Sequence, residues 1–316
     1  MKSTYDTFHG VLPINKPVGP SSHQAVDKVR RILGQQAIGH AGTLDPAAEG
    51  LLVLLLGRAT KAARFLTATD KTYEALITLG RESTTYDVEG LTDDAAPAAT
   101  VAIEEAAVRQ ILAGMVGRIR QTVPAYSAVR VNGQRLYERA RRGEPADPPE
   151  REVEIHRLVL TSFVGNVLAV EVTCSAGTYV RSLAHDIGRK LGCGGYLSAL
   201  RRTASGRLRL ADAVDLDTIE AAAHSGTVDR LLLGIDQALG CEAITVADDF
   251  RRAVLDGRCP AAGDIIAATG RFASGDRILV KDLSGSVLAI AIAQLDSTRM
   301  QSGDNAAILK YDRVLA

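Results

Sequence analysis

The 316-residue sequence has no tryptophan, few cysteines and no long hydrophobic run. Its four cysteines are far apart and form no Cys-x-x-Cys pair, which excludes the spacing of a zinc site and the framework of a disulfide-rich secreted domain. Apolar runs such as Leu51 to Leu56 are far too short to span a bilayer, and the polar first ten residues lack the apolar core of a signal peptide. We therefore expect a cytoplasmic protein without a membrane segment.

The fingerprints of common cofactor sites are also missing. The sequence contains no Gly-x-x-x-x-Gly-Lys phosphate loop, no Rossmann glycine fingerprint and no Gly-x-Ser-x-Gly nucleophile elbow. His40 has no cluster of histidines or carboxylates around it at ligand spacing, which argues against a metal site there. These absences predict a protein that uses no organic cofactor, no nucleotide energy source and no metal.

A net charge is absent as well, because 37 Lys and Arg residues balance 37 Asp and Glu residues. The balance conceals local segregation. Residues 109–142 carry eight basic residues against one acidic residue and residues 181–209 carry seven against one, whereas 82–105 and 212–249 are acidic. Affinity for a phosphate backbone depends on local potential. One basic block is usually only a solvated face, but two blocks make RNA a candidate partner.

Periodicity predicts both helices and strands, and a hydrophobic content of 46% allows a sizeable core. The predicted strands lie within 10–20 and at 72–79, 152–160 and 167–174. The first predicted helix is capped by Ser21 or Ser22 and ends at Gly34, and the others lie near 60–67, over 101–116 and over 178–191. The apolar run at 51–56 fits either a strand or a buried helix.

The length indicates one large domain, which we place at 1–242, and a smaller one. Residues 92–100 are predicted to form a loop, and the Arg-rich, Gly- and Pro-containing stretch at 121–150 an exposed insertion. The acidic region at 212–242 is predicted to be helical and to face solvent. Short β-rich runs separated by Gly-Asp and Ser-Gly turns then predict a small all-β domain at 245–316.

The loop from Gly39 to Pro46, Gly-His-Ala-Gly-Thr-Leu-Asp-Pro, holds a single carboxylate at Asp45. An Asp in such a position is either a helix cap or a reactive group on a rigid support, and residue type and spacing alone favour the cap. The neighbours favour reactivity, because Gly39 and Gly42 permit a ligand to approach the backbone closely and Pro46 fixes the exit of the loop.

A reactive Asp45 requires a cation, since a buried carboxylate otherwise takes up a proton. Arg181 is the best candidate, because it falls in the first turn of the helix predicted to begin near Thr178. A cation at that end opposes the helix dipole, and an anion held nearby would explain it. A surface arginine in a basic helix is the alternative.

Five further residues allow both a structural and a functional interpretation. Tyr73 and Leu200 fit a hydrophobic core, or a stacking platform and a wall for a flipped base. Tyr179 fits either packing at a helix start or a place in the same pocket. His40 either bonds within its loop or fills the gap that an extruded base leaves. Lys16 is either exposed to solvent, bound to phosphate or a support for the Asp45 loop.

The order of the motifs over residues 10–210 resembles that of the bacterial tRNA pseudouridine-55 synthases, the TruB type. The matching elements are Asn15-Lys16-Pro17, Gly39 to Pro46, Gly57-Arg58-Ala59-Thr60-Lys61, Lys71-Thr72-Tyr73, Asp87-Val88-Glu89-Gly90, Tyr126-Ser127-Ala128, Asn132-Gly133, Cys174 to Arg181 and Leu200-Arg201-Arg202-Thr203. Residues 245–316 are similar, less specifically, to the PUA-type RNA-binding domain of that family. Two positions depart from the pattern: Val123, where proline is usual, and Arg130, where lysine is usual.

The resemblance implies an α+β fold, with a mixed, largely antiparallel central sheet, flanking helices and a small C-terminal β-barrel of the PUA type. It implies isomerisation of uridine 55 to pseudouridine in the T loop of tRNA. Asp45 would be the nucleophile, Arg181 its ion-pair partner and Tyr73 the residue that stacks on the base. The substrate site would be lined by His40, Tyr179, Leu200 and Lys16. The reaction moves a bond within one substrate and so implies no cofactor.

The residue pattern leaves open whether Asp45 attacks the sugar, adds to the ring or takes a sugar proton. The implied partner is the T arm of tRNA, bound by a monomer with no obligatory protein partner. Extruding the stacked uridine costs on the order of a few kcal/mol.

One rival is a guide-RNA-dependent relative, although the lysine-rich tails of its eukaryotic members are absent. Another is a non-catalytic tRNA-binding or tRNA-folding protein, which would have no reason to keep the Asp, the Arg and the Tyr together.

Overall fold

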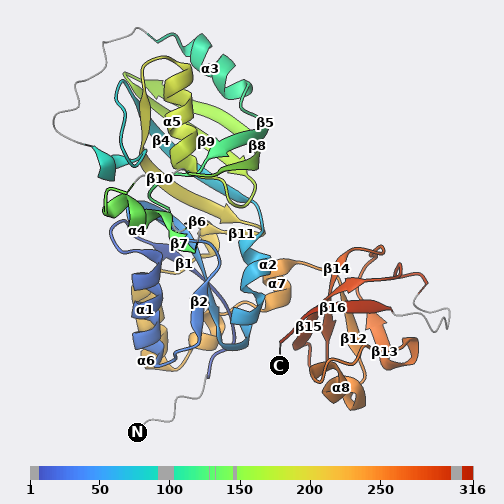
Figure 1. Ribbon diagram of the computed structural model, residues 1–316. Coiled ribbons are helices and arrows are strands. Elements are labelled where there is room, and N and C mark those ends of the chain that lie inside the picture. The colour runs from blue at the N-terminus through green and yellow to red at the C-terminus, as the bar shows by residue number, and fades with distance from the viewer. Residues whose placement is uncertain are drawn as a thin grey trace.

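The computed structural model describes residues 7–91, 103–127, 129–131, 133–144, 148–299 and 308–315. Its main sheet has nine strands in the order β1-β3-β10-β4-β9-β8-β5, with β2 paired to β3 and β11 to β10 (Figure 1). The strands are β1 Gly10–Lys16, β2 Ile38–His40, β3 Ala48–Leu56, β4 Lys71–Leu79, β5 Gly117–Thr122, β8 Glu150–Val164, β9 Val167–Cys174, β10 Gly195–Ser205 and β11 Leu208–Arg209. The pairing of β3 with β10 is parallel and the others are antiparallel. The predicted mixed, largely antiparallel sheet is confirmed.

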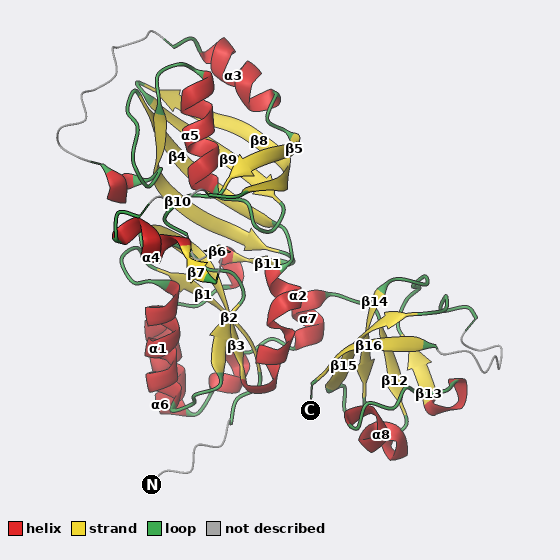
Figure 2. Ribbon diagram, viewed as in Figure 1, coloured by secondary structure: helices red, strands yellow, loops and turns green. Residues whose placement is uncertain are grey.

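Helices flank this sheet, as predicted (Figure 2). They are α1 Ser22–Leu33, α2 Ala63–Thr67, α3 Glu105–Ala113, α4 Leu136–Arg141, α5 Val180–Lys190, α6 Leu216–Ser225 and α7 Ile235–Leu239. Helices α5 and α3 lie on one face of the half of the sheet formed by β4, β9 and β8, and α1 packs against α6 near the other end. The start of α1 resolves the ambiguity between two serines, because Ser21 is the N-cap and Ser22 is the first helical residue.

Burial explains why the run at 51–56 is a strand. Side chains on one face of β3, such as Leu52 and Leu54, join the core beneath α1, while Leu51 and Val53 on the other face join a second cluster that includes residues of α7. A strand covered on both faces is apolar at every position. By contrast, β4 alternates between buried and more exposed positions, which matches its predicted pattern.

Two predicted segments differ from the structure. The helix expected over 101–116 is α3, which covers only Glu105–Ala113. The stretch at 121–150 is less exposed than expected: it begins within β5, it contains the hairpin β6 Arg130–Val131 and β7 Gln134–Arg135 followed by α4, and it buries Val123 and Leu136. A few isolated apolar residues are enough to anchor a polar segment to the core. The average composition of the segment does not reveal such anchors. The loop expected at 92–100 lies outside the described residues.

The C-terminal part contains a second sheet, as expected for a PUA-like region. Its strand order is β13-β12-β14-β15-β16, and the strands are β12 Ala243–Val246, β13 Ile265–Ala268, β14 Arg277–Lys281, β15 Val287–Ala293 and β16 Leu309–Val314. A short helix, α8 Arg251–Leu255, packs on it, so the segment is β-rich and not all-β. We propose residue 242, just before β12, as the boundary between the two parts.

The two parts are joined by a shared apolar cluster. Phe65 of α2 packs in one cluster with Leu279 and Ile290 of the second sheet, and α2 and α7 lie between the two sheets in Figure 1. The guanidinium groups of Arg64 and Arg277 both lie over the Phe65 ring, 4.6 and 4.9 Å from its centroid. The C-terminal sheet is therefore docked against α2.

Candidate active site

The fold brings most of the predicted site residues to one pocket. This pocket has a volume of about 330 Å³, and its lining includes Asp45, Tyr73, Tyr179, Arg181 and Leu200. The topology accounts for the convergence, because Asp45 precedes β3, Leu200 lies on β10 and Tyr73 lies on β4, and these three strands are neighbours in the sheet. Helix α5, which carries Arg181, follows β9, the next strand in the sheet.

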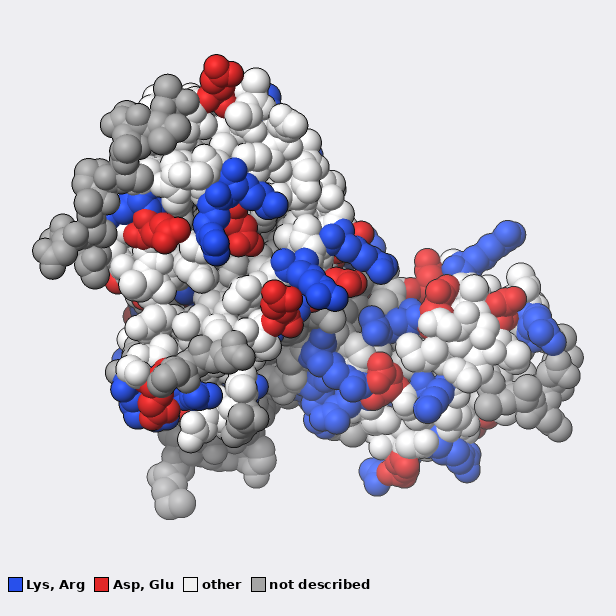
Figure 3. All heavy atoms as spheres, turned by 45° about the horizontal axis from the view of Figure 1, so that its top comes forward, with Lys and Arg blue, Asp and Glu red and all other residues white. Residues whose placement is uncertain are grey.

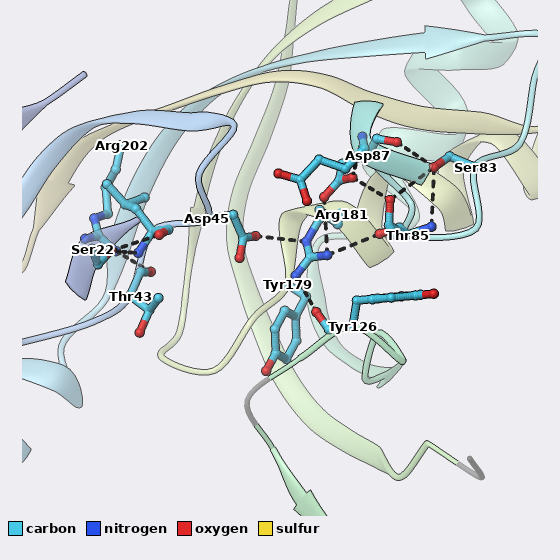
Figure 4. Close-up of polar contacts among 12 residues, drawn as sticks. Ser22, Thr43, Asp45, Ser83, Thr85, Asp87, Tyr126, Tyr179, Arg181 and Arg202 are labelled. Atoms are coloured by element: carbon cyan, nitrogen blue, oxygen red, sulfur yellow. Dashed lines mark hydrogen bonds and ion pairs between the residues drawn. The ribbon is translucent and has the colours of Figure 1, made fainter. Parts of the chain in front are cut away.

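Asp45 and Arg181 form an ion pair in this pocket. Arg181 Nε lies 2.9 Å from Asp45 Oδ2, and the Arg181 side chain is 7% exposed whereas that of Asp45 is 41% exposed (Figure 4). The geometry at Nε is not that of a hydrogen bond, so charge attraction joins the two groups. Desolvation raises the pKa of the Asp45 carboxyl, and the charge of Arg181 opposes this rise. The carboxylate is thus reachable from the pocket while its cation is buried.

A second carboxylate, Asp87, holds Arg181 from the other side. Arg181 Nη1 lies 3.3 Å from Asp87 Oδ2 and donates to the carbonyl of Thr85 at 3.2 Å, while Nη2 donates to the carbonyl of Tyr126 at 3.1 Å. Asp87 is itself fixed, because its Oδ1 accepts from Thr85 Oγ1 at 2.5 Å and from the backbone N–H of Glu89 at 3.0 Å. Residue reasoning did not single out Asp87, although its motif was among those quoted for the resemblance.

The backbone around Asp45 is held by buried polar side chains that lie outside the pocket. Ser22 Oγ donates to the carbonyl of Leu44 and accepts from the N–H of Leu44, both at 2.8 Å. Lys16 is fully buried, and its Nζ donates to the carbonyls of Pro17 and Pro20 at 2.8 and 2.9 Å. The turn that contains Pro17 and Pro20 is hydrogen-bonded to the Asp45 loop, because the N–H of Gly19 donates to the carbonyl of Pro46 at 2.9 Å.

The start of α5 is held in a similar way by Gln121 of β5. Its amide donates to the carbonyl of Tyr179 at 3.0 Å and accepts from the N–H of Tyr179 at 2.7 Å, and Gln121 is fully buried. Ser182 Oγ donates to the carbonyl of Thr122 at 2.8 Å. These contacts fix the first turn of α5, and with it the position of Arg181. Sequence reasoning missed Gln121 because a polar residue at the end of an edge strand carries no distinctive pattern.

Aromatic side chains from separate segments line the same pocket as Asp45. Tyr73 is 8% exposed on the inward face of β4, and burial raises the pKa of its hydroxyl. Tyr126 and Tyr137, from the stretch expected to be an exposed insertion, line the pocket together with Tyr179. A flat base inserted here would meet π-faces and one carboxylate.

Two predicted residues are not among those that line the pocket. Lys16 lies behind the Asp45 loop, where desolvation lowers the pKa of its ammonium group and the charge of Asp45 opposes that shift. His40 ends β2, pairs with Leu54 of β3 and is partly buried, and this burial lowers the pKa of its imidazole. Their contacts with substrate stay predictions.

A larger hollow of about 630 Å³ shares Leu200 with the pocket. Each carboxylate in its lining has an arginine nearby: Arg201 lies 3.8 Å from Glu49 and 4.0 Å from Glu74, and Glu171 pairs with Arg157. The cation of the first two carboxylates, Arg201, is 48% exposed, whereas Arg181 beside Asp45 is buried, so the pocket that contains Asp45 is the stronger candidate for an active site.

Charged side chains are distributed unevenly over the surface. Figure 3 shows Lys and Arg among Asp and Glu, with a dense basic group near the junction with the C-terminal part. Two arginines of the basic block 181–209, Arg181 and Arg202, are buried and so do not face solvent. In the other block, Arg109 pairs with Glu105 at 2.6 Å. Counting charges along the sequence therefore overstates the number of unpaired cations that face solvent.

The described ranges hold neither a metal-binding cluster nor a helix that could cross a membrane. No group of three or more His, Cys, Asp or Glu side chains is placed there to hold a metal ion, and the four cysteines are free. None of the helices in those ranges combines the length and the apolar character that crossing a membrane requires.

Comparison with known proteins gives consistent similarities. Residues 30–180 match the model of the N-terminal domain of TruB family pseudouridylate synthases, and residues 181–240 match that of a tRNA pseudouridylate synthase B C-terminal domain. The chain is 38% identical over 321 residues to tRNA pseudouridine synthase B of Xanthomonas campestris pv. campestris strain 8004, covering 96% of this chain and 97% of that protein. It is 41% identical over 288 residues to the protein of the same name from Bacillus subtilis, covering 89% and 92%.

Solved structures agree with these matches. A chain in the crystal structure of a Cbf5-Nop10-Gar1 complex is 25% identical to this one, with a TM-score of 0.75, and the match covers 98% of this chain and 85% of that chain. The shared fold extends through the C-terminal sheet.

Proposed function

The chain belongs to the TruB family of pseudouridylate synthases, and we propose that it converts uridine 55 in the T loop of tRNA to pseudouridine with Asp45 as its nucleophile. The tRNA substrate is supported by the names of the relatives. The position within tRNA and the role of Asp45 are supported by the matching motifs and by the pocket. The ion pair of Asp45 with a buried Arg181 is the observation that carries the proposal.

The reaction requires an ionised carboxylate beside the C1′–N1 bond. Arg181 supplies the charge that keeps Asp45 ionised in a desolvated site, and Asp87 holds the guanidinium in place. As the C1′–N1 bond breaks, the uracil keeps the electron pair, turns in the pocket and joins C1′ through C5. The hydrogen on C5 then leaves as a proton and N1 gains one, so atoms and charge balance without a cofactor.

The pocket suits a base that has left its stack. Its volume of about 330 Å³ lies at the small end of the range of ligand sites, roughly 300–1,000 Å³. Tyr73 is proposed to stack on the uracil, and Tyr179 and Leu200 to bound it. Stacking and phosphate contacts offset the cost of extruding the base. The enzyme is expected to act in the cytoplasm, as a monomer, on the T arm of tRNA.

Tritium release tests this proposal directly. A T arm labelled with tritium at C5 of uridine 55 alone should release label to water, and the same RNA labelled at a different uridine should not. Asp45→Asn should abolish release while the Kd for the RNA stays within about threefold. The matched control is Asp27→Asn, which removes a partly exposed carboxylate of α1 that pairs with Arg30, and it should react at the parent rate.

The outcomes separate the rival functions. Turnover by Asp45→Asn would show that the nucleophile is another group. Tight binding of tRNA by the parent protein without any release of tritium would favour a non-catalytic tRNA-folding role. Release that appears only when a guide RNA and partner proteins are added would favour the guide-dependent relative.

A further inference from the structure

Arg202 on β10 carries a buried charge that the proposed chemistry does not yet use. The residue is 1% exposed, and within the described part of the chain no Asp or Glu oxygen lies within 4 Å of its guanidinium group. Burying a cation without a carboxylate is strongly unfavourable unless its donors are satisfied. An apolar side chain would fill the same space at lower cost, so stability alone does not explain this residue.

The donors of Arg202 are satisfied by backbone carbonyls on both sides of the Asp45 loop. Nε donates to the carbonyl of Leu51 in β3 at 2.7 Å, and Nη2 and Nη1 donate to the carbonyls of Gly42 and Thr43 at 2.9 and 3.4 Å. One planar group thus ties the loop before Asp45 to the strand after it. In Figure 4 Asp45 lies between Arg202 and Arg181.

The loop is shaped to receive this guanidinium. Gly42 has a φ of 100°, which L side chains rarely adopt, and a Cβ placed there would lie 3.5 Å from Arg202 Nη1 and 3.8 Å from Lys71 Cε. The glycine therefore lets the backbone turn its carbonyl toward the arginine. At Gly39, by contrast, an added Cβ would meet no atom within 4 Å.

We propose that Arg202 is a positioning residue for the reaction, one that fixes the backbone from Gly42 to Asp45 and thereby the direction of the Asp45 carboxylate. This inference rests on the proposed function. A lysine in its place keeps the charge but presents a single nitrogen, which cannot follow the fork that spans the three carbonyls. Misplacing a reacting group by about 1 Å costs roughly 10²-fold in rate.

Arg202 also acts on the strand opposite. It pairs in register with Tyr73 of β4, the proposed stacking residue. Desolvation raises the pKa of the Tyr73 hydroxyl, and the charge of Arg202 opposes that rise. One buried guanidinium therefore contacts the nucleophile loop and influences the aromatic wall of the same pocket.

The test compares Arg202→Lys and Arg202→Met by single-turnover tritium release and by the Kd for the T arm. The expected result is a rate lower by roughly 10²-fold for Arg202→Lys and lower still for Arg202→Met, with each Kd within about threefold of the parent. The matched control is Arg30→Met. Arg30 donates to the carbonyl of Ile38 at 2.6 Å, so this variant also loses a charge and a backbone contact but should keep the parent rate.

Each result decides the inference. If Arg202→Met does not fold, Arg202→Lys alone decides, because it retains the charge. A parent-like rate for Arg202→Lys would overturn the inference, as would a rate loss matched by an equal loss of RNA affinity or a loss of similar size in Arg30→Met. The proposed function is tested by whether the parent protein releases tritium at all. The role of Arg202 is tested by the ratio of the variant rate to the parent rate, so the two can fail separately.

Discussion

Arg181 and Asp87 form a buried ion pair, with Nη1 and Oδ2 3.3 Å apart and both side chains at most 7% exposed. Because Asp87 is the inner of the two carboxylates around Arg181, it holds the guanidinium toward Asp45. Asp87→Asn should lower the single-turnover rate by about 10- to 100-fold, since the arginine loses its rigid support. It should also lower the free energy of unfolding by about 1–3 kcal/mol, measured by urea titration.

The control for that variant is Glu89→Gln in the same short turn, because the Glu89 side chain is exposed. It should change neither the rate nor the stability appreciably. A parent-like rate for Asp87→Asn would mean that the carbonyls of Thr85 and Tyr126 suffice to place Arg181.

Asp45→Asn should stabilise the protein at neutral pH while abolishing turnover. The pKa of the Asp45 carboxyl is raised in the folded state above its ordinary value of 3.8. The protonated Asp45 carboxyl therefore favours the folded state fully below pH 3.8. This stabilisation is lost as the pH rises through the pKa of the folded state. Thermal denaturation should show the variant more stable than the parent at pH 7, by an amount that shrinks as the pH falls toward 3.8. A variant less stable at pH 7 would show that attraction to Arg181 outweighs desolvation.

Ser22→Ala should lower both the stability and the reaction rate. It leaves the buried N–H and carbonyl of Leu44 unpaired, which costs about 1–3 kcal/mol, and it frees the loop just before Asp45. Ser21→Ala is the control, because it removes the N-cap of α1, worth about 1 kcal/mol, without contacting the loop. Urea titration should show a loss in both variants, and tritium release should fall only in Ser22→Ala. Equal rates in the two would remove the positioning role of Ser22.

Phe65→Ala should loosen the C-terminal sheet from the larger part. The ring lies in an apolar cluster with residues of both parts, and loss of a buried phenyl group typically costs about 3–5 kcal/mol. Limited proteolysis should cut faster near residues 240–242. Phe250→Ala, which removes a ring from the core of the C-terminal sheet alone, should not expose that junction. Identical cleavage in both variants would place the coupling elsewhere.

Affinity for the T arm should fall as salt rises, with a slope set by the cations that face solvent. Since Arg181 and Arg202 are buried, neither should contribute to counterion release. A plot of log Kd against log salt should therefore have the same slope in Arg202→Met, which lacks the charge, as in the parent. A flat plot for the parent would remove the role of the basic blocks in binding.

The sequence was sufficient to predict the fold and the convergence of the site, and it offered Lys16 as a support of the Asp45 loop, but it did not indicate the other supports. Helical periodicity placed α5, and alternation placed β4, because each has one buried face. The alignment of motifs with a known family brought Asp45, Tyr73 and Arg181 together. Ser22, Gln121 and Arg202 could not be predicted, since each acts on a distant carbonyl or N–H group, and no local pattern marks a polar side chain that will be buried.

The position of β10 affects how the chain can be made. This strand lies between β3 and β4, yet it is synthesised more than a hundred residues after them. A chain emerging from the ribosome therefore carries two unpaired strand edges until residue 205 has appeared, and unpaired edges are sites of aggregation. The same strand carries Arg202 and Leu200, so the pocket is incomplete for all of that time. We therefore expect that a nascent chain cannot modify tRNA, and that its open strand edges need shielding, until this central strand is inserted.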